Sequence, residues 1–502
     1  MRAVAVAAGV AAALVAGLRW LRVAQREHYL PGATSRFAVR WWTLGANRVL
    51  ALAVAAGVVL SVRSPLAAAV AAGAVAAGPF GLSPRGRTAR LAWTRRLRTL
   101  AGAWAVLLLL AVAAGAAAGV GPTAALLAAA FTPVLVDAAL AATAPLERRL
   151  AAPYVARATA RLAQVGPTVV AITGSYGKTT TKGYVAHLLA ATRSVVATPA
   201  SFNNRAGLAR SVNENLTPGT EVFVAEMGTY GPGEIADLCS WCPPDVAVIT
   251  AIGPVHLERM GTEDDIAAAK AEILDRARVA VLNVDHPLLA ALADRRVAAG
   301  QVVLRCSAAA GAGADVAVVD GVVWAGGRVV GRVPSPGPQP TNVACAVAVA
   351  RELGVPDAVV AERLGTLPAA RNRLNVSTSD RGAVVIDDTY NANPAGAAVA
   401  LAALARHGSP GHLRVVVTPG MVELGPRQHE ENARFAEAAA AVASHLVVVG
   451  HTNRRALLEG AAGGGAEVVA VGTREQAVAW VRQHVGEGDA VLYENDLPDH
   501  FA

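Results

Sequence analysis

The sequence predicts an α/β protein with transmembrane helices at its N-terminus, then a central α/β domain and a smaller Rossmann-like α/β domain. Three observations lead to this fold class. The 502 residues are 54% hydrophobic and only 16% charged, and the apolar excess is concentrated before residue 145. A glycine-rich loop at 174–177 follows a strand-like run and precedes a helix-like run. Beyond it, strand-like and helix-like runs alternate, as a mostly parallel sheet requires.

Five apolar stretches with few charges are the candidate membrane spans. They lie near 3–18, 49–62, 65–82, 100–120 and 123–143. A transmembrane helix needs about 20 apolar residues, and the fourth stretch has that length. The second is short and requires tilt or a thinner bilayer. A soluble Ala-rich bundle is the alternative, and the scarcity of charges within the runs disfavours it.

Arginines between these stretches predict their orientation, because cytoplasmic loops are enriched in Lys and Arg. Six arginines lie in 19–48 and six in 83–99, whereas connections such as that at Arg63 are nearly uncharged. Five spans with the N-terminus outside place every Arg-rich segment in the cytoplasm. We therefore expect a multi-pass protein of the cell membrane with everything after residue 145 in the cytoplasm. Asp137, within the fifth stretch, is either functional or close to the membrane surface.

The basic residues are divided very unevenly between arginine and lysine. Of 45 Lys and Arg residues only three are lysines, Lys178, Lys182 and Lys270. Lysine supplies a compact ammonium or, once neutral, a nucleophilic amine, which arginine cannot do. We interpret these lysines as kept for chemistry. The net charge of +8 comes without a basic stripe interleaved with aromatic residues, so no nucleic-acid partner is expected.

The segment Thr173-Gly-Ser-Tyr-Gly-Lys-Thr-Thr180 is a short variant of the P-loop. A glycine-rich turn before an ordinary helix is the alternative. In a P-loop, backbone N–H groups close around phosphate, and the helix N-terminus adds a favourable dipole. We predict that Lys178 reaches the β- and γ-phosphates of ATP and that the Thr179 hydroxyl binds Mg²⁺. The predicted ATP-binding loop comprises Gly174, Ser175, Tyr176, Gly177, Lys178, Thr179 and Thr180.

With these motifs the chain resembles the Mur ligase family, most of all its D-alanyl-D-alanine-adding members. The resemblance covers about 165–502 and depends on several motifs that occur in the family's order. Besides the P-loop they are Asn203-Asn204 with Gly207, Glu226-Met-Gly228, 252–258 with His256, 269–273 with Lys270, Asn283-Val-Asp285, Arg373, 387–394 and 421–425.

The resemblance implies an ATP-dependent ligase that joins a carboxylate to an amine. The carboxylate attacks the γ-phosphate of ATP, and the amine then displaces phosphate from the acyl phosphate. Lys270 would be carbamylated by CO₂, which requires a neutral amine and gives an anion that suits a hard cation. The resemblance implies four catalytic residues, Lys178, Glu226, His256 and Lys270. Two Mg²⁺ ions would be held by Thr179, Glu226, His256 and Lys270. The nucleotide would also contact Asn283, Arg373 and Asp388, and the substrate would bind to Asn203, Asn204 and Asn391.

Each of these residues has a purely structural alternative when it is taken alone. His256 could be a core or surface histidine, Glu226 an ordinary strand-end carboxylate, and Asn203-Asn204 a loop that caps the next helix. Their joint occurrence in the family's order is what favours the site.

The resemblance ends at the N-terminus, where family members have a soluble domain for the UDP part of the substrate. Here an apolar region occupies 1–150, before a central ATP-binding domain at 151–368 and a C-terminal domain at 369–502. We therefore expect a lipid-linked or polymeric carboxylate acceptor, such as a cell-envelope precursor at the membrane. The amine, an amino acid or peptide, stays open, because 426–432 and 493–499 depart from the family pattern. A poly-γ-glutamate or cyanophycin-type polymerising ligase and a membrane NTPase are the alternatives.

Overall fold

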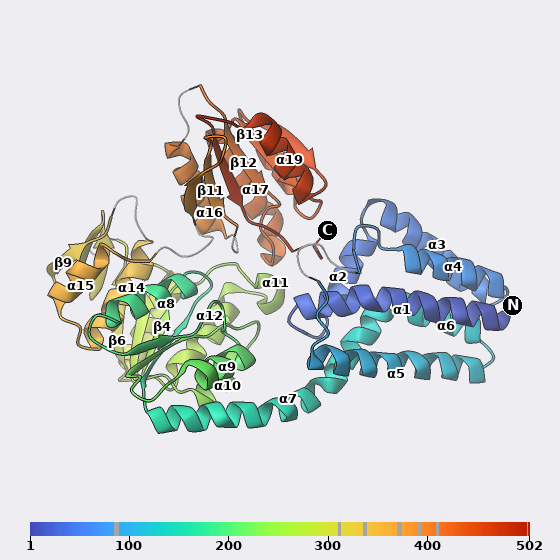
Figure 1. Cartoon of the computed structure of the whole chain (residues 1–502), viewed down its shortest axis with the longest axis horizontal. Helices are drawn as coiled ribbons and strands as arrows, with labels where there is room; N and C mark the ends of the chain where they lie inside the picture. The colour runs from blue at the N-terminus through green and yellow to red at the C-terminus, as the bar shows by residue number, and fades with distance from the viewer. Residues whose placement is uncertain are drawn as a thin grey trace. The chain divides into compact units, whose positions relative to one another are not determined.

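The computed structural model describes residues 1–84, 90–309, 313–334, 339–368, 374–389, 393–407, 411–498 and 500–501. The chain forms two compact units. The helical unit contains residues Met1–Ala151 together with the C-terminal residues from Leu497, and the α/β unit contains Ala152–Asp496. Figure 1 shows the helices and strands in each, coloured along the chain.

The described part of the helical unit contains helices and connecting loops. Its elements are α1 (Arg2–Arg26), α2 (Ala33–Trp42), α3 (Gly45–Ser61), α4 (Pro65–Ala77), α5 (Arg95–Ala117), α6 (Gly121–Ala130) and the first half of α7 (Thr132–Val165). Helix α1 packs against α4 and α6, and α3 packs against α4. All five predicted apolar stretches are therefore helical over most of their length.

The number of helices long enough to cross a bilayer is smaller than predicted. Among the described residues, two single helices, α1 and α5, are long and apolar enough to cross a bilayer. Two bent pairs of helices, α2–α3 and α6–α7, could each form one more span, which gives up to four. Helix α4 has 13 residues, about 20 Å, because it ends just before Gly78-Pro79 and proline cannot continue a helix. The expectation of five single-helix spans is thus corrected to two, or up to four, by length and composition.

Small residues bring the helices of this unit into close contact. A Cβ added at Gly57 of α3 would lie 2.2 Å from Cβ of Ala71 in α4. One added at Gly115 of α5 would lie 2.0 Å from Cβ of Ala124 in α6. Packing through small residues is typical of helices in lipid, where burial of apolar area between helices gains little. Large apolar side chains remain more than half exposed on the outside, among them Leu52, Val59, Val106, Leu109 and Leu110.

Asp137, one of the charged groups buried inside the helical unit, caps a helix. Its carboxylate accepts hydrogen bonds from the backbone N–H groups of Thr34 at 3.3 Å and Ser35 at 2.8 Å, and from the Ser35 hydroxyl at 2.5 Å. These groups lie in the first turn of α2, where a negative charge is favoured by the helix dipole. These hydrogen bonds give Asp137 a structural role, which explains why a carboxylate occurs in this apolar stretch.

The C-terminus of the chain is packed into the helical unit. The carbonyl of His500 accepts a hydrogen bond from Nε1 of Trp41, and Nε2 of His500 lies 2.8 Å from Oε1 of Glu27. The ring of Phe501 contacts that of Phe37 with centroids 4.9 Å apart. The α/β unit is therefore connected covalently to the helical unit at both ends, through α7 and through the C-terminal residues.

The central domain of the α/β unit is built on a nine-stranded sheet of order β2-β3-β1-β4-β5-β6-β7-β8-β9. Strands β2 to β7 are parallel, and β8 and β9 add an antiparallel edge. The strands are β1 (Thr168–Thr173), β2 (Val195–Ala197), β3 (Val222–Glu226), β4 (Val246–Ile249), β5 (Val279–Asn283), β6 (Val302–Ser307), β7 (Val316–Val319), β8 (Val322–Ala325) and β9 (Arg328–Arg332).

Helices cover both faces of this sheet, so its inner strands are continuous apolar runs. In β1, Val169 and Ala171 belong to one buried cluster, whereas Val170 and Ile172 belong to the cluster on the other face. The helices, several labelled in Figure 1, are α8 (Lys178–Leu189), α9 (Arg205–Asn215), α10 (Glu234–Trp241), α11 (Leu257–Met260), α12 (Glu263–Ala271), η1 (Glu272–Leu274), α13 (Pro287–Ala298), α14 (Pro340–Glu352) and α15 (Asp357–Leu364).

The C-terminal domain has a six-stranded sheet of order β10-β11-β15-β12-β13-β14, parallel except for β10 at its edge. The predicted α/β character of both domains is thus confirmed. The strands are β10 (Asn375–Thr378), β11 (Val384–Asp388), β12 (Arg414–Thr418), β13 (His445–Val449), β14 (Glu467–Val471) and β15 (Ala490–Glu494). The helices are α16 (Pro394–Arg406), η2 (Gly425–Arg427), α17 (Gln428–Val442), α18 (Arg454–Ala461) and α19 (Arg474–His484).

The close contact between α5 and α6 gives a test of the helical unit. Gly115→Ala places a methyl group against Ala124, and overpacking of this kind costs about 1–3 kcal/mol. We expect a lower melting temperature for the detergent-solubilised protein. Gly102→Ala in the same helix is the control, because nothing lies within 4 Å of its added Cβ. Equal melting temperatures for the two variants would contradict the packing described.

Candidate active site

The loop 174–177 connects β1 to α8 at the carboxyl end of the parallel strands, where ligands bind in open α/β sheets. Its two glycines have positive φ, +151° at Gly174 and +77° at Gly177. A Cβ at Gly174 would lie 2.0 Å from Oγ1 of Thr250, and one at Gly177 would lie 2.3 Å from Oδ1 of Asn342. Glycine is therefore the residue that fits at both positions, with the end of β4 on one side of the loop and α14 on the other.

Lys178 is the first residue of α8, and its side chain folds back over the loop. Its Nζ donates hydrogen bonds to the carbonyl oxygens of Gly174 at 2.6 Å and Ser175 at 3.3 Å. The ammonium thus lies beside the loop and the helix N-terminus, where a phosphate is attracted by backbone N–H groups. A phosphate bound there would be a stronger partner for Lys178 than these carbonyls, because both groups are charged.

The other predicted loop residues hold the loop in place. The Ser175 hydroxyl is buried and accepts a hydrogen bond from the backbone N–H of Gly253 at 3.1 Å. Tyr176 packs beside a core cluster that contains Val255 of the central domain and Met421 of the C-terminal domain. Thr180 lies in the first turn of α8. The loop therefore contacts both domains of the α/β unit.

Glu226, the last residue of β3, is the centre of a buried polar cluster. Its side chain is 1% exposed, and its backbone pairs with that of Ile172 in β1. Oε2 accepts hydrogen bonds from Oγ1 of Thr179 at 2.9 Å and from Nζ of Lys182 at 3.0 Å. Oε1 accepts one from Nδ2 of Asn203 at 3.1 Å. The structure thus brings together three predicted site residues, Thr179, Asn203 and Glu226.

Lys182 also belongs to this cluster, although the sequence predicted no specific role for it in the site. Its side chain is 7% exposed and forms the ion pair with Glu226. Two signals in the sequence pointed to it. Lys182 is one of only three lysines, and it lies four residues after Lys178, which places both on one face of α8.

Lys270 and His256 complete the set of predicted catalytic side chains. Lys270 in α12 is 1% exposed, and burial, reinforced by the charge of Lys178, lowers the pKa of its amine well below the usual value. Burial also lowers the pKa of His256; hydrogen bonding to Glu423 opposes this shift, and the charges of Lys270 and Lys178 add to it. These mutual effects show that Lys178, His256 and Lys270 lie within electrostatic range of one another.

Glu423 of the C-terminal domain reaches this group of central-domain residues. Its Oε2 accepts a hydrogen bond from Nδ1 of His256 at 2.6 Å, and its Oε1 accepts one from Arg259 at 2.9 Å. A second pair, Arg427 with Glu263 at 2.8 Å, joins the same two domains. The C-terminal domain therefore contributes a carboxylate next to the P-loop side of the central domain.

Comparison with known proteins matches both domains of the α/β unit. Residues 172–335 match the Mur ligase middle domain, and residues 372–493 match the Mur ligase glutamate ligase domain. The UDP-N-acetylmuramoyl-tripeptide–D-alanyl-D-alanine ligase of Mycobacterium leprae is 34% identical over 399 residues, covering 71% of this chain and 74% of that protein. The chain belongs to the Mur ligase family. The enzyme of that name from Mycobacterium tuberculosis is 35% identical over 389 residues, covering 71% of both chains.

Solved structures of Mur ligases share the fold. MurF from Acinetobacter baumannii is similar with a TM-score of 0.59 and 26% identity, over 68% of this chain and 77% of that one. MurF from Thermotoga maritima in complex with ADP has a TM-score of 0.58 and 29% identity, over 68% of this chain and 80% of that one. This Mur ligase is accordingly an ATP-dependent ligase.

The donor set of this Mur ligase fits one Mg²⁺ ion beside the P-loop. Mg²⁺ in nucleotide sites usually takes one or two carboxylates, and phosphates and water supply the remaining ligands. The Thr179 hydroxyl and Glu226 carboxylate, 2.9 Å apart, match that need. Within the described residues no three His, Cys, Asp or Glu side chains gather as a metal cage. A second ion near His256 and Lys270 requires that Lys270 not be an ammonium, because an ammonium repels a cation.

Asn283 and Asn204 have structural contacts at the edge of the site. Nδ2 of Asn283 donates to the carbonyl of Thr250 at 2.9 Å, which ties β5 to the segment that supports the P-loop. Oδ1 of Asn204 accepts from the backbone N–H of Gly207 at 2.9 Å and caps α9. The helix-capping alternative therefore describes Asn204, and its role in substrate binding stays a prediction.

The remaining predicted residues belong to the start of the C-terminal domain. Asp388 ends β11, and its Oδ1 accepts a hydrogen bond from the backbone N–H of Leu374 at 3.1 Å. Arg373 and Asn391 lie outside the described residues. The nucleotide contacts predicted for Arg373 and Asp388 stay predictions.

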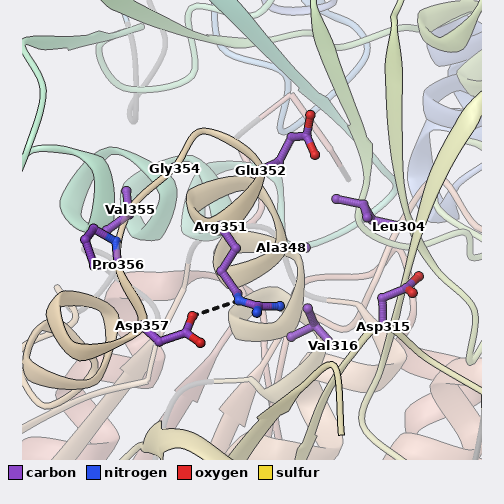
Figure 2. A pocket seen from close by; sticks show the side chains of 10 residues that line it. All are labelled: Leu304, Asp315, Val316, Ala348, Arg351, Glu352, Gly354, Val355, Pro356 and Asp357. Atoms are coloured by element: carbon purple, nitrogen blue, oxygen red, sulfur yellow. Dashed lines mark hydrogen bonds and ion pairs between the residues drawn. The ribbon is translucent and has the colours of Figure 1, made fainter. Parts of the chain in front are cut away.

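A pocket of about 440 Å³ lies elsewhere in the central domain (Figure 2). It is lined by residues of β6, β7 and α14 and of the turn before α15. Its arginine, Arg351, donates to Asp357 at 2.8 Å, and Glu352 pairs with Arg278 at 2.9 Å. It contains none of the predicted site residues, and its charged groups are already paired.

The buried pair of Lys182 and Glu226 gives a test of the site's architecture. Removing one partner of a buried ion pair costs about 3–5 kcal/mol, because the other charge stays buried alone. We expect Lys182→Met to lower the free energy of unfolding by about 3 kcal/mol and to abolish ATP-dependent activity. Adding Glu226→Gln in the same chain should restore much of the stability and none of the activity. A single variant as stable as the wild type in thermal denaturation would contradict the pairing.

Proposed function

We propose that this Mur ligase joins an amino acid or peptide to a peptidoglycan precursor that is presented at the cytoplasmic face of the cell membrane. The observation that carries the proposal is the buried cluster of Glu226, Thr179 and Lys182 next to Lys178 and the glycine loop. It is a site for a magnesium nucleotide, in a chain whose other unit is an apolar helical bundle.

The proposed reaction has two steps, in which charge must be neutralised and water excluded. A carboxylate oxygen of the acceptor attacks the γ-phosphorus of ATP, and ADP leaves. The amine nitrogen then attacks the carbonyl carbon of the acyl phosphate, phosphate leaves, and the nitrogen loses a proton to give the amide. Lys178 neutralises charge on the transferring phosphoryl group. Thr179 and Glu226 would hold Mg²⁺, which supplies further positive charge at the phosphates when bound.

The C-terminal domain supports the exclusion of water. A Cβ at Gly425 would lie 2.9 Å from the backbone N of Glu258, so the start of η2 is in close contact with the backbone of α11. Met421 and Leu424 are buried in one cluster with Val255. Close docking of this loop protects a hydrolysable acyl phosphate and holds two reactants together.

The chemistry of Lys270 supports its carbamylation. An amine whose pKa is lowered by burial has a larger neutral fraction near neutral pH, and only the neutral amine adds to CO₂. The carbamate is an anion, which removes the repulsion among Lys178, Lys270 and a bound cation and provides oxygen ligands for Mg²⁺.

The helical unit supports placement at the membrane. Its exposed surface is rich in large apolar side chains, and its helices contact one another through small residues. The family resemblance implies a soluble domain for the UDP part of the substrate where this unit stands, so we assign the acceptor to the lipid-linked class. A UDP-linked precursor, the substrate type in the names of the curated relatives, is the competing class.

Product identification tests this function. Detergent-purified full-length protein is given ATP, Mg²⁺ and a panel of amino acids and dipeptides, with lipid-linked or UDP-linked muramoyl peptides. We expect mass spectrometry to detect one amide product on the lipid-linked acceptor together with ADP. A product on the UDP-linked acceptor alone would refute the lipid-linked assignment. A ladder of products would indicate a polymerising ligase, and ATP hydrolysis that needs no amine would indicate an NTPase.

Lys270 gives a second test. We expect Lys270→Ala to abolish ligation, because position 270 then has no amine to carbamylate. A short carboxylic acid added to the assay should restore part of the activity by supplying the missing anion. Full activity of the variant without the acid would rule out the role of Lys270 at the metal site.

A further inference from the structure

Glu423 makes two hydrogen bonds from the C-terminal domain to the central domain. It lies in the loop between β12 and η2, whereas His256 is the N-cap residue just before α11. Its two carboxylate oxygens accept from Nδ1 of His256 at 2.6 Å and from Arg259 at 2.9 Å. A carboxylate paired with arginine is an acceptor, so the proton in the bond to His256 is on Nδ1.

The two residues that form this hydrogen bond both have an unusual backbone conformation. His256 has φ of +75° and Glu423 has φ of +66°, in the left-handed region that residues other than glycine rarely adopt. Such conformations persist where the surroundings require them, and they concentrate at functional sites. Next to Glu423, Gly425 also has positive φ and is in backbone contact with Leu257. The bond is therefore part of a docked interface.

The imidazole of His256 is also bounded by an aromatic ring. The Tyr230 ring meets it edge to face with centroids 5.4 Å apart, and the guanidinium of Arg259 lies 4.7 Å from the centre of the Tyr230 ring. Tyr230, Arg259 and Glu423 together fix the plane of the imidazole. One of its nitrogens is engaged by Glu423, which leaves Nε2 as the atom available for other chemistry.

We propose that Glu423 is a positioning residue that fixes His256 as the Nδ1–H tautomer and so keeps Nε2 as a lone-pair donor for the magnesium-nucleotide site. The inference rests on the proposed function, in which His256 serves that site. A histidine that ligates a metal commonly donates its other ring N–H to a carboxylate, which sets tautomer and orientation. Here the carboxylate comes from the other domain. Docking of the loop 421–425 therefore prepares His256, and the nucleotide site is complete only when the two domains are in contact.

The tautomer is measured directly by ¹⁵N NMR of the full-length protein in detergent, labelled at histidine and assigned with a His256→Asn variant. In the wild type we expect His256 to be protonated at Nδ1. In Glu423→Ala the acceptor is lost, and we expect the proton to move to Nε2 in most molecules. Glu423→Gln keeps an acceptor oxygen and should retain the wild-type tautomer in part.

Glu263→Ala is the matched control. It also removes a carboxylate bond between the two domains, that to Arg427 at 2.8 Å, and no contact joins Glu263 to His256 in the described structure. We expect its His256 tautomer to be that of the wild type. If Glu423→Ala does not fold, Glu423→Asp shortens the same side chain by one methylene and should lower the Nδ1–H fraction.

A second measurement separates positioning from general stability. The Mg²⁺ concentration for half-maximal ATP turnover should rise about 10–100-fold in Glu423→Ala, as is usual when the partner of a metal-ligating histidine is removed. Glu423→Gln should recover part of this, and Glu263→Ala should not change it.

The outcomes distinguish the inference from the function on which it rests. An unchanged tautomer in Glu423→Ala overturns the positioning role, whatever products the enzyme makes. A changed tautomer in Glu423→Ala, together with no ligation by the wild type on any acceptor, supports the positioning role and refutes the proposed function instead. A tautomer shift of equal size in Glu263→Ala would also overturn the inference, because domain contact in general would then be responsible.

Discussion

The structure of the catalytic half depends on one buried carboxylate. Glu226 ends β3, which lies between β2 and β1 in the sheet, and only 1% of its side chain is exposed. A charge in such a place is very unfavourable without partners. Lys182, Thr179 and Asn203 supply them, from the helix after the P-loop and from the loop before α9. This single group fixes the first turn of α8, the end of β3 and the 203–204 loop relative to one another. The glycine loop lies between the end of β4 and α14.

The strand, the glycine loop and the helix could be predicted from the sequence because their signals are local. The strand, glycine loop and helix are consecutive, and Glu226 directly follows a continuous apolar run. The partner of Lys182 could not be derived in this way, because it depends on β1 and β3 being neighbours in the sheet, a tertiary fact. The contact between Glu423 and His256 joins residues 167 apart in the chain and depends on two strained backbone positions that no pattern reveals.

In the helical unit, composition alone overestimated the number of membrane spans. Five apolar stretches predicted five spans, but prolines at 79 and 133 break two of them, so helix length differs from the length of the apolar run. Asp137 had two interpretations from sequence, and its three hydrogen bonds at the start of α2 make it a cap. Nothing in the sequence indicated that His500 and Phe501 pack among the N-terminal helices. The last residues of a chain carry little periodicity from which such docking could be predicted.

The central claim is that Glu226 belongs to a magnesium-nucleotide site. Calorimetric titration of ATP into the full-length protein, with and without Mg²⁺, tests it most directly when wild type and Glu226→Gln are compared. The account predicts that Mg²⁺ tightens ATP binding by the wild type and has little effect on the variant. Equal tightening in both proteins would contradict it, because the metal would then bind without this carboxylate.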